Sequence, residues 1–246
     1  MIELFIGTSG WTYDHWRGIF YPEELAKAKW FSYYAGQFNS VEINATFYRT
    51  FKDQTFINWR NKAPQGFRYV LKAPRSITHR KYLENVTEEI QAFDRSASLL
   101  EDKLGLILLQ LAPGTPYDIE RLRTACLAFN NPQKIAVEFR HKRWLTDETF
   151  SLLKELGVTF CNPDSPRGSL SEYVTSSKGY IRLHGRKQWY SYNYSNEELQ
   201  EIANTVQRMN SAGIDTVYIF FNNDFEGYAP KNAQYLANIL HEMSES

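Results

Sequence analysis

Charged side chains follow short apolar runs at several points of this 246-residue chain, and such pairs can bind ligands or transfer protons. The stretch IAVEFRHKRW shows the pattern: Ile135, Ala136 and Val137 precede Glu138 and Arg140. Because alternate side chains of a strand share a face, Glu138 and Arg140 are predicted to lie together at the end of a strand. They form either a salt bridge that completes a core or part of a functional site.

Polar side chains, many of them ionisable, also end the seven other apolar runs. Ionisable groups in such places are unfavourable unless they are paired or hydrogen-bonded, so a common cause is expected. One explanation is a structural network in which Glu42, Glu138 and Asp164 neutralise Lys72, Arg140 and Arg182; the others are an active site or simple anion binding. The polar residues that end these runs are Thr8, Ser9, Trp11, Glu42, Asn44, Lys72, Gln110, Glu138, Arg140, Asp164, Arg182, His184, Asn222, Asn223 and Asp224.

General acid–base chemistry is the first function that these residues suggest. Glu138 and His184 are the leading catalytic candidates and Glu42 is the third, since each stands near a cation that can tune its pKa. Arg140, Arg182 and Lys72 are predicted to clamp a phosphate or carboxylate, the two arginines in bidentate fashion. The further predicted substrate contacts are Trp11, Asn44, Tyr48, Asp164, Asn222 and Asn223.

Aromatic residues make up 15% of the chain, and several follow the apolar runs. They are expected either to stack on a sugar or a base or to pack in loops. These aromatic candidates are Trp11, Trp16, Tyr48, Trp144 and Trp189.

A metal site is the main alternative chemistry. Glu42, Glu138, Asp164 and His184 have the ligand types that Mg²⁺ or Mn²⁺ prefers, but HExxH is absent and the arginines would repel a cation. We therefore expect no cofactor and keep a divalent metal as an open alternative. Glycoside hydrolysis also stays open, because it depends on a separation between carboxylates that the sequence does not reveal.

Two further segments carry weaker signals. In FEGYAPKNAQYL, Gly227 predicts a turn and Pro230 the first turn of a helix whose amides could bind phosphate, assisted by Lys231 and Asn232. Among the remaining histidines, His79 in KAPRSITH is the better candidate.

Eight apolar or β-branched runs predict strands separated by helical segments. Thr115-Pro116 predicts one helix start, Ser195 with Glu198 a capping box, and Gly213 a helix end. This alternation is typical of parallel βαβ units, and without a GxGxxG turn it favours a single (β/α)8 TIM barrel over residues 1–246. The strands are predicted at residues 4–9, 40–44, 68–73, 105–111, 134–140, 157–164, 179–185 and 216–223.

The composition limits the class of protein. With 28 basic and 28 acidic residues the formal charge is zero, which does not favour a broad nucleic-acid interface. No apolar run approaches the length of a membrane span and the N-terminus has no signal-peptide pattern, so a cytoplasmic protein without a membrane partner is expected. Cys126 and Cys161 fit a reducing compartment and are expected to be small core residues.

The chain contains, in this order, the stretches GTSGW, WRGIFYP, FNSVEINATFY, GFRYVLKAPRSITH, AVEFRHKRW, YIRLHG and FNNDFEGYAPKNA. Together they resemble the DUF72 family, also called the YecE-like family, from about residue 4 to residue 240. LLQLAP is similar to the fourth-strand signature, with Ala112 in place of an expected proline. The resemblance implies a TIM barrel and the position of a site, but no reaction. The family's motif residues correspond here to Gly7, Ser9, Gly10, Trp11, Glu42, Asn44, Tyr48, Lys72, Pro74, Glu138, Arg140, Arg182, His184, Gly185, Asn222 and Asn223.

We therefore expect an enzyme that acts on a polar anionic small molecule, such as a phosphorylated or carboxylated sugar or nucleotide derivative. The alternatives are a divalent-metal-dependent phosphoesterase, by analogy of fold, and a protein that binds a ligand or nucleic acid without turnover.

Overall fold

The structure is a computed structural model that describes residues 2–245, and within it the chain forms two compact units. Unit 1 contains the chain up to Glu42, Asn162–Val174 and the chain from Lys178 onward. Unit 2 contains Ile43–Cys161 and Thr175–Ser177. The prediction of one domain over residues 1–246 stays a prediction.

All eight predicted strands are present, although several end earlier than the apolar runs suggested. β5 ends at Glu138, so Phe139 and Arg140 lie just beyond the strand. The strands are β1 (Glu3–Thr8), β2 (Ser40–Ile43), β3 (Arg68–Lys72), β4 (Leu104–Gln110), β5 (Ile135–Glu138), β6 (Thr159–Asp164), β7 (Lys178–Leu183) and β8 (Thr216–Phe221).

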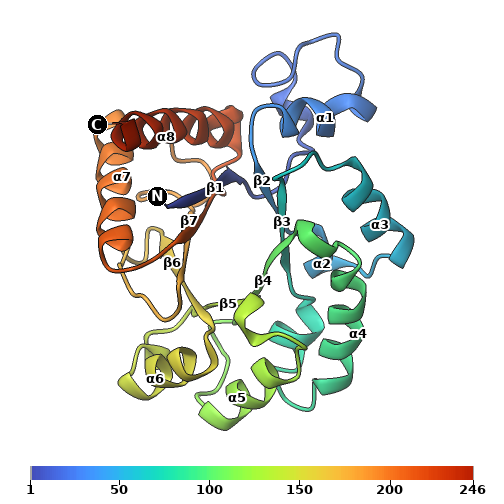
Figure 1. The fold of residues 1–246 in the computed structure, drawn as a ribbon, viewed down its shortest axis with the longest axis vertical. Coiled ribbons are helices and arrows are strands. Elements are labelled where there is room, and N and C mark those ends of the chain that lie inside the picture. The colour runs from blue at the N-terminus through green and yellow to red at the C-terminus, as the bar shows by residue number, and fades with distance from the viewer. Residues whose placement is uncertain (1, 246) are drawn as a thin grey trace. The chain divides into compact units, whose positions relative to one another are not determined.

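The strands follow the hydrogen-bonded order β1-β8-β7-β6-β5-β4-β3-β2 (Figure 1). The pairs β1–β8, β7–β8, β3–β4, β4–β5 and β5–β6 are parallel. Within unit 1, a parallel bridge between Ser9 and Glu42 joins the segment after β1 to β2. This topology confirms the predicted (β/α)8 barrel.

Helices fill most of the connections between the strands. The α-helices are α1 (Trp30–Ala35), α2 (Ala45–Tyr48), α3 (Asp53–Lys62), α4 (Thr87–Ser98), α5 (Ile119–Leu127), α6 (Asp147–Leu156), α7 (Asn196–Ser211) and α8 (Tyr228–Glu245). The short helices are η1 (Asp14–Trp16), η2 (Lys27–Lys29), the π-helix η3 (Ser76–Arg80), η4 (Glu101–Lys103), η5 (Pro132–Lys134), η6 (Lys142–Trp144) and η7 (Phe225–Gly227).

The predicted helix ends were mostly correct. Ser195 and Glu198 form the capping box of α7, and Gly213 follows the last turn of that helix with a φ of 93°. The predicted start at Thr115 was wrong: α5 begins later, where the Asp118 carboxylate accepts a hydrogen bond from the backbone N–H of Arg121. Asp is among the best N-cap residues, which explains the later start.

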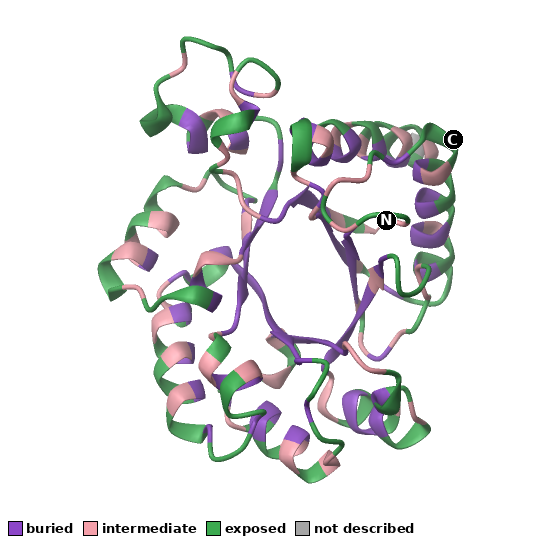
Figure 2. Cartoon of the chain, turned by 180° about the vertical axis from the view of Figure 1, so that it is seen from behind, coloured by how far each residue is buried: buried purple, intermediate pink, exposed green. Residues whose placement is uncertain are grey.

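The core of each unit lies between its strands and its helices. In unit 1, α8 packs on β1 and β8, and Phe5 of β1 stacks on Tyr218 of β8. In unit 2 every residue of β4 is buried. Figure 2 shows the same pattern, with buried strands and helices that are buried on one side. Cys126 and Cys161 are both buried, which confirms their predicted place in the core.

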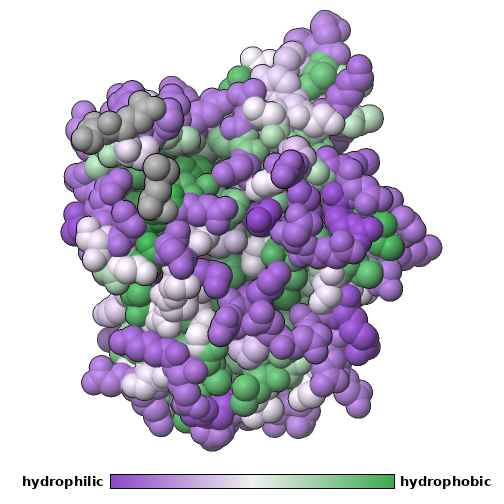
Figure 3. All heavy atoms as spheres, in the orientation of Figure 1, coloured by the Kyte–Doolittle hydropathy of each residue, from purple (hydrophilic) through white to green (hydrophobic). Residues whose placement is uncertain are grey.

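The described helices are not suited to a bilayer. None of those within residues 2–245 combines the length and the apolar character needed to cross a membrane. The space-filling view shows mostly hydrophilic side chains with smaller hydrophobic patches on the face that it presents (Figure 3).

Candidate functional site

In unit 1 a cluster forms around Glu42, which is completely buried. Its carboxylate accepts hydrogen bonds from Arg182 Nε at 2.8 Å and Arg182 Nη2 at 2.7 Å. Ser9 Oγ donates to the same carboxylate at 2.7 Å, and the Tyr180 hydroxyl donates a further short bond. We call these four residues the Glu42 cluster.

The strands bring the Glu42 cluster together. Tyr180 and Arg182 are two residues apart on β7 and therefore share a face. The bridge between Ser9 and Glu42 sets the other two side chains side by side. Burial alone would raise the pKa of Glu42. The charge and hydrogen bonds of Arg182, together with the hydrogen bonds of Tyr180 and Ser9, outweigh this effect and lower the pKa.

The geometry of this cluster favours a structural role. Four donors occupy the carboxylate of Glu42, and the side chain of Arg182 is only 1% exposed. A base must be able to accept a proton, and a clamp must reach its ligand. The predicted catalytic role of Glu42 and the predicted anion-binding role of Arg182 stay untested, but this arrangement does not favour them.

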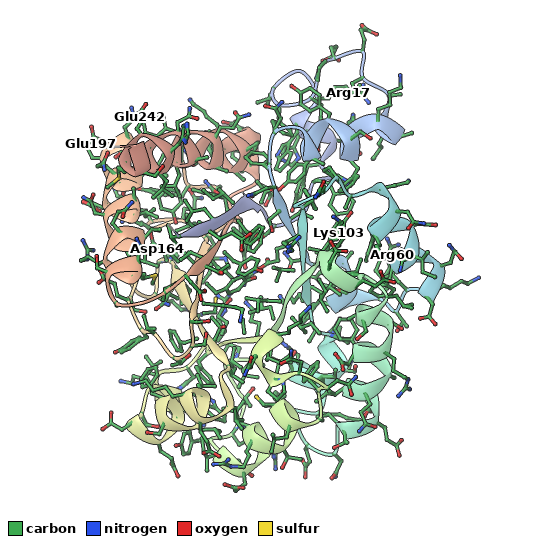
Figure 4. All side chains as sticks on the ribbon, in the orientation of Figure 1. Arg17, Arg60, Lys103, Asp164, Glu197 and Glu242 are labelled. Carbon is green, nitrogen blue, oxygen red and sulfur yellow. The ribbon has the colours of Figure 1, made fainter. Side chains whose placement is uncertain are left out.

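Asp164 of unit 1 pairs with an arginine that the sequence analysis missed. Arg186 Nε donates to Asp164 at 3.0 Å and Arg186 Nη1 to Glu201 at 2.8 Å. Burial raises the pKa of Asp164 despite this partner. Figure 4 labels Asp164 between the strands and α7, whereas Glu197 and Glu242 point outward. Asp164 therefore pairs with a cation outside the set of Lys72, Arg140 and Arg182, because the loop after β7 returns Arg186 to that carboxylate.

His184 follows β7 and is completely buried. Its Nδ1 lies 3.1 Å from the amide nitrogen of Asn222, and its ring packs against Trp189, with centroids 5.4 Å apart, and Tyr190. Since an amide nitrogen only donates, this contact favours the tautomer with the proton on Nε2. His184 and Asn222 are thus in contact just beyond the ends of β7 and β8.

Asn223 and Asn232 form hydrogen bonds within the protein. The amide nitrogen of Asn223 donates to the carbonyl of Tyr192 at 2.7 Å and to Oδ1 of Asn232 at 2.9 Å. Asn232 also donates to Asn193 at 3.1 Å. These hydrogen bonds hold the loop after β7 in place. Because both residues are buried, they are poorly placed for the substrate contact predicted for Asn223 and the phosphate contact predicted for Asn232.

In unit 2 a second cluster forms around Glu138, which is also completely buried. Gln110 Nε2 donates to Glu138 Oε1 at 3.0 Å, and Arg140 forms an ion pair with the same oxygen. Cys161 Sγ lies 3.9 Å from Glu138 Oε2. The ion pair confirms that Glu138 and Arg140 lie together, as the alternation of the strand predicted.

The register of the sheet explains which side chains meet here. Lys72 pairs with Leu108, and Gln110 pairs with Glu138. Because Leu108 and Gln110 are two residues apart, Lys72, Gln110 and Glu138 share one face at the C-terminal ends of three neighbouring strands. These ends are where TIM barrels carry their functional residues.

Phe47 links Lys72 to His79. The ammonium of Lys72 lies 4.1 Å from the centre of the Phe47 ring, and the His79 ring meets Phe47 edge-on with centroids 4.8 Å apart. Burial, followed by the charges of Lys72, Arg140 and Arg75, lowers the pKa of His79 to about 4, with Glu138 opposing. We call Lys72, His79, Gln110, Glu138 and Arg140 the Glu138 cluster.

The Glu138 cluster carries more positive than negative charge. It contains two permanent cations and one carboxylate, and its histidine is neutral at pH 7. Lys72 is 8% exposed and the side chain of Arg140 is 15% exposed, so both charges lie at the edge of the interior. From this position Lys72 and Arg140 can both donate hydrogen bonds to a bound anion.

The other two predicted contacts in unit 2 flank this cluster. Asn44 is partly exposed and its carbonyl accepts a hydrogen bond from the backbone N–H of Phe47 at 3.1 Å at the start of α2. Tyr48 is 70% exposed and packs edge-on against Phe47. Tyr48 is therefore well placed to cover a ligand.

The aromatic candidates divide into core and surface residues. Trp16 and Trp144 are buried, which favours the loop-packing alternative for both. Trp11 and Trp189 are partly exposed. Trp11 packs on Phe31 and Trp189 on His184, and each leaves some surface open.

Among residues 2–245, no group of three or more His, Cys, Asp or Glu side chains is arranged to hold a metal ion. Unit 2 contains a pocket of about 270 Å³ whose lining includes none of the predicted site residues. Its walls are formed by Thr46, Arg49, Thr50, Phe51, Phe56, Pro74, Ser76, Glu89, Ala92, Phe93 and Ser96.

Residues 5–246 match the model of a family described as protein of unknown function DUF72. The chain belongs to the DUF72 family. It is 26% identical to the UPF0759 protein YunF of Bacillus subtilis over 96% of this chain and 94% of that protein. It is 29% identical to the UPF0759 protein YecE of Escherichia coli over 57% of this chain and 50% of that protein.

Solved structures agree with the family assignment. A DUF72 family protein from Thermotoga maritima superimposes with a TM-score of 0.87 and 30% identity, covering 99% of this chain and 100% of that one. A xylose isomerase domain containing protein from Salmonella typhimurium matches with a TM-score of 0.52 and 13% identity over 85% of this chain and 89% of that one. The second likeness shows only that the barrel fold is shared.

Proposed function

We propose that this DUF72 protein is an enzyme that binds a polar anionic small molecule at the Glu138 cluster. The observation that carries the proposal is the meeting of Lys72, Arg140 and Glu138 at the C-terminal ends of neighbouring strands. The proposed ligand is phosphorylated or carboxylated, such as a sugar or nucleotide derivative. Arg140 can form two parallel hydrogen bonds to such a group, and Lys72 adds a point charge.

Within this proposal Glu138 is the acid–base residue. Its carboxylate is buried and oriented by Gln110, and its partner Arg140 can turn toward an anion because part of the arginine reaches solvent. When Arg140 binds the ligand, Glu138 becomes a stronger base because it loses the nearest positive charge. For Glu42 we propose an orienting role toward Arg182, and for His184 an acid–base role with Asn222 fixing its ring.

Ligand-dependent thermal stability tests the binding step. Phosphorylated sugars, nucleotides and carboxylates should be screened against wild type, Lys72→Met and Lys103→Met. Lys103 is a matched control, because it is 9% exposed in the same unit but donates to the carbonyl of Pro64 at 2.9 Å, outside the cluster (Figure 4). A compound that stabilises wild type and Lys103→Met should bind Lys72→Met about tenfold more weakly or worse, the usual loss for a charged hydrogen bond.

Glu138→Gln separates an enzyme from the alternatives. For an enzyme, this variant should keep its affinity within about threefold and lose about 100-fold or more of turnover. Binding without turnover by wild type would favour the ligand-binding alternative, and turnover only with Mg²⁺ or Mn²⁺ would favour the metal-dependent phosphoesterase. An equal loss of ligand affinity in Lys72→Met and Lys103→Met would overturn the assignment of the ligand site to the Glu138 cluster.

A further inference from the structure

His79 occupies an unusual backbone segment after β3. It lies in the π-helix η3, where the backbone N–H of Lys81 donates to the carbonyl of Ser76 at 3.0 Å. Single π-turns are rare and frequently occur at functional sites. Ile77 and Thr78 of this turn are buried, whereas His79 is partly exposed. The π-turn therefore packs into the core through Ile77 and Thr78, and the imidazole of His79 lies at the edge of the core.

Two contacts fix the imidazole ring. Phe47 is 8% exposed and holds Lys72 on its face and His79 at its edge. The Nδ1 atom of His79 lies 2.9 Å from the hydroxyl of Thr78, which is 1% exposed. If Nδ1 carries the proton and donates to Thr78, then Nε2 has the lone pair that a base needs.

Charged groups on three segments surround this ring. Lys72 lies on β3, Arg75 precedes η3 and Arg140 follows β5, and all three oppose protonation of His79. Glu138 on β5 favours protonation but is outweighed. A bound anion would add negative charge beside Lys72 and Arg140 and so reduce the repulsion that keeps the imidazole neutral.

We propose that His79 is a proton-exchanging residue of the Glu138 cluster and takes up a proton from solvent when an anion binds beside Lys72 and Arg140. This inference rests on the proposed anion site. It adds His79 to that site and makes anion binding depend on pH. The proton binds to Nε2, and no other covalent bond changes. A charged imidazole beside the bound anion then contributes a further hydrogen-bond donor and can return its proton to an oxygen of the ligand.

Sulfate is the probe for this coupling, because it keeps its double negative charge at every pH used. Calorimetric titrations at pH 5.0 and pH 7.5 should compare wild type, His79→Gln and Lys72→Met. If binding restores an ordinary histidine pKa of about 6.5, wild type should bind sulfate about 10- to 30-fold more tightly at pH 5.0 than at pH 7.5. His79→Gln should show a change of about twofold or less.

Nuclear magnetic resonance of ring-labelled histidine gives an independent readout. The pKa of His79 should lie near 4 without sulfate and rise by about two units when sulfate saturates the protein. In the unliganded protein at pH 7.5, the nitrogen shifts should show the proton on Nδ1. Thr78→Val should populate the other tautomer, because it removes the acceptor of that proton.

The outcomes distinguish this inference from the proposed function. If wild type binds no sulfate at either pH, the anion site itself fails and the inference fails with it. If sulfate binds to wild type, is lost in Lys72→Met and shows no dependence on pH, the anion site stands and the role of His79 is wrong. A histidine that titrates near 6.5 without sulfate, or a tautomer unchanged by Thr78→Val, would also overturn the role of His79.

Discussion

The Glu42 and Glu138 clusters contain the same central pair, a buried glutamate and an arginine, but they differ in how completely the pair is enclosed. Glu42 accepts four hydrogen bonds, two of them from an arginine whose side chain is 1% exposed. Glu138 pairs with an arginine whose side chain is 15% exposed, beside Lys72 and His79. The Glu42–Arg182 pair is enclosed by its neighbours, whereas Arg140 of the Glu138–Arg140 pair reaches the edge of the interior.

This difference shows why an ion pair at the end of a strand does not by itself mark a site. Once donors fill a carboxylate and both charges leave water, the pair resists change and holds the strands in place. A cluster with excess charge near solvent can exchange a protein partner for a ligand. Substitutions in the two clusters test this contrast.

The largest effect is expected from Arg182→Met. Removing this arginine leaves Glu42 as a buried charge without its counter-ion, so the free energy of unfolding should fall by about 3–5 kcal/mol. Arg140→Met should lose only about 1–2 kcal/mol, because the arginine is partly exposed and Lys72 still offsets the charge of Glu138. Urea unfolding at pH 7 measures both values.

An exposed pair calibrates this measurement. Arg123 forms two hydrogen bonds to Glu155, at 2.6 and 3.0 Å, on the surface of unit 2. Arg123→Met should change stability by less than about 1 kcal/mol, as is usual for exposed ion pairs. Equal losses for Arg182→Met and Arg140→Met would show that the two clusters are enclosed alike, and the contrast would be wrong.

The two clusters should also lose stability in different ranges of pH. The pKa of His79 is about 4 in the folded state against 6.5 when unperturbed, so the stability it contributes is complete above pH 6.5 and is lost as the pH falls toward 4. The pKa of Glu42 is lowered from 4.5, so its contribution is complete above pH 4.5 and is lost only below that value. Acid should therefore weaken the Glu138 cluster first.

Unfolding in urea from pH 7.5 to pH 3.5 tests this order with His79→Gln and Glu42→Gln. His79→Gln should flatten the pH dependence between 6.5 and 4 by on the order of 1 kcal/mol, since solvent screens a partly exposed group. Glu42→Gln should flatten it only below pH 4.5, by at most about 1.4 kcal/mol for each pH unit. If both variants flattened the pH dependence in the same range, the assignment of His79 to the higher pH range and of Glu42 to the lower one would be wrong.

Much of the fold could be predicted from the sequence. The eight apolar runs predicted all eight strands because parallel strands of a barrel are buried along their whole length. The alternation in IAVEFRHKRW correctly predicted that Glu138 and Arg140 meet. The start of α5 was wrong because Thr115 and Asp118 are both good caps, and only the folded backbone decides between them.

The partners of the charged residues could not be predicted in the same way. Which carboxylate meets which arginine depends on sheet register and on loops that return over long stretches, as Arg186 does to Asp164. The sequence singled out His79 but could not predict its environment, which depends on a π-turn and on Phe47 from another segment. Burial of Trp16 and Trp144 likewise follows from tertiary packing that no local pattern reveals.

Two buried tyrosines separate the effect of an acceptor's charge from the effect of its burial. Tyr180→Phe removes one donor from Glu42, and Tyr69→Phe removes a donor from the neutral carbonyl of Trp59, 2.9 Å away. Both tyrosines are completely buried, so the lost packing is the same. Hydrogen bonds to charged groups are stronger, so Tyr180→Phe should lower the free energy of unfolding by about 2 kcal/mol and Tyr69→Phe by about 1 kcal/mol. A larger loss for Tyr69→Phe in urea unfolding would mean that the remaining donors already satisfy Glu42. Tyr180 would then be a packing residue of the Glu42 cluster and not one of the groups that stabilise its charge.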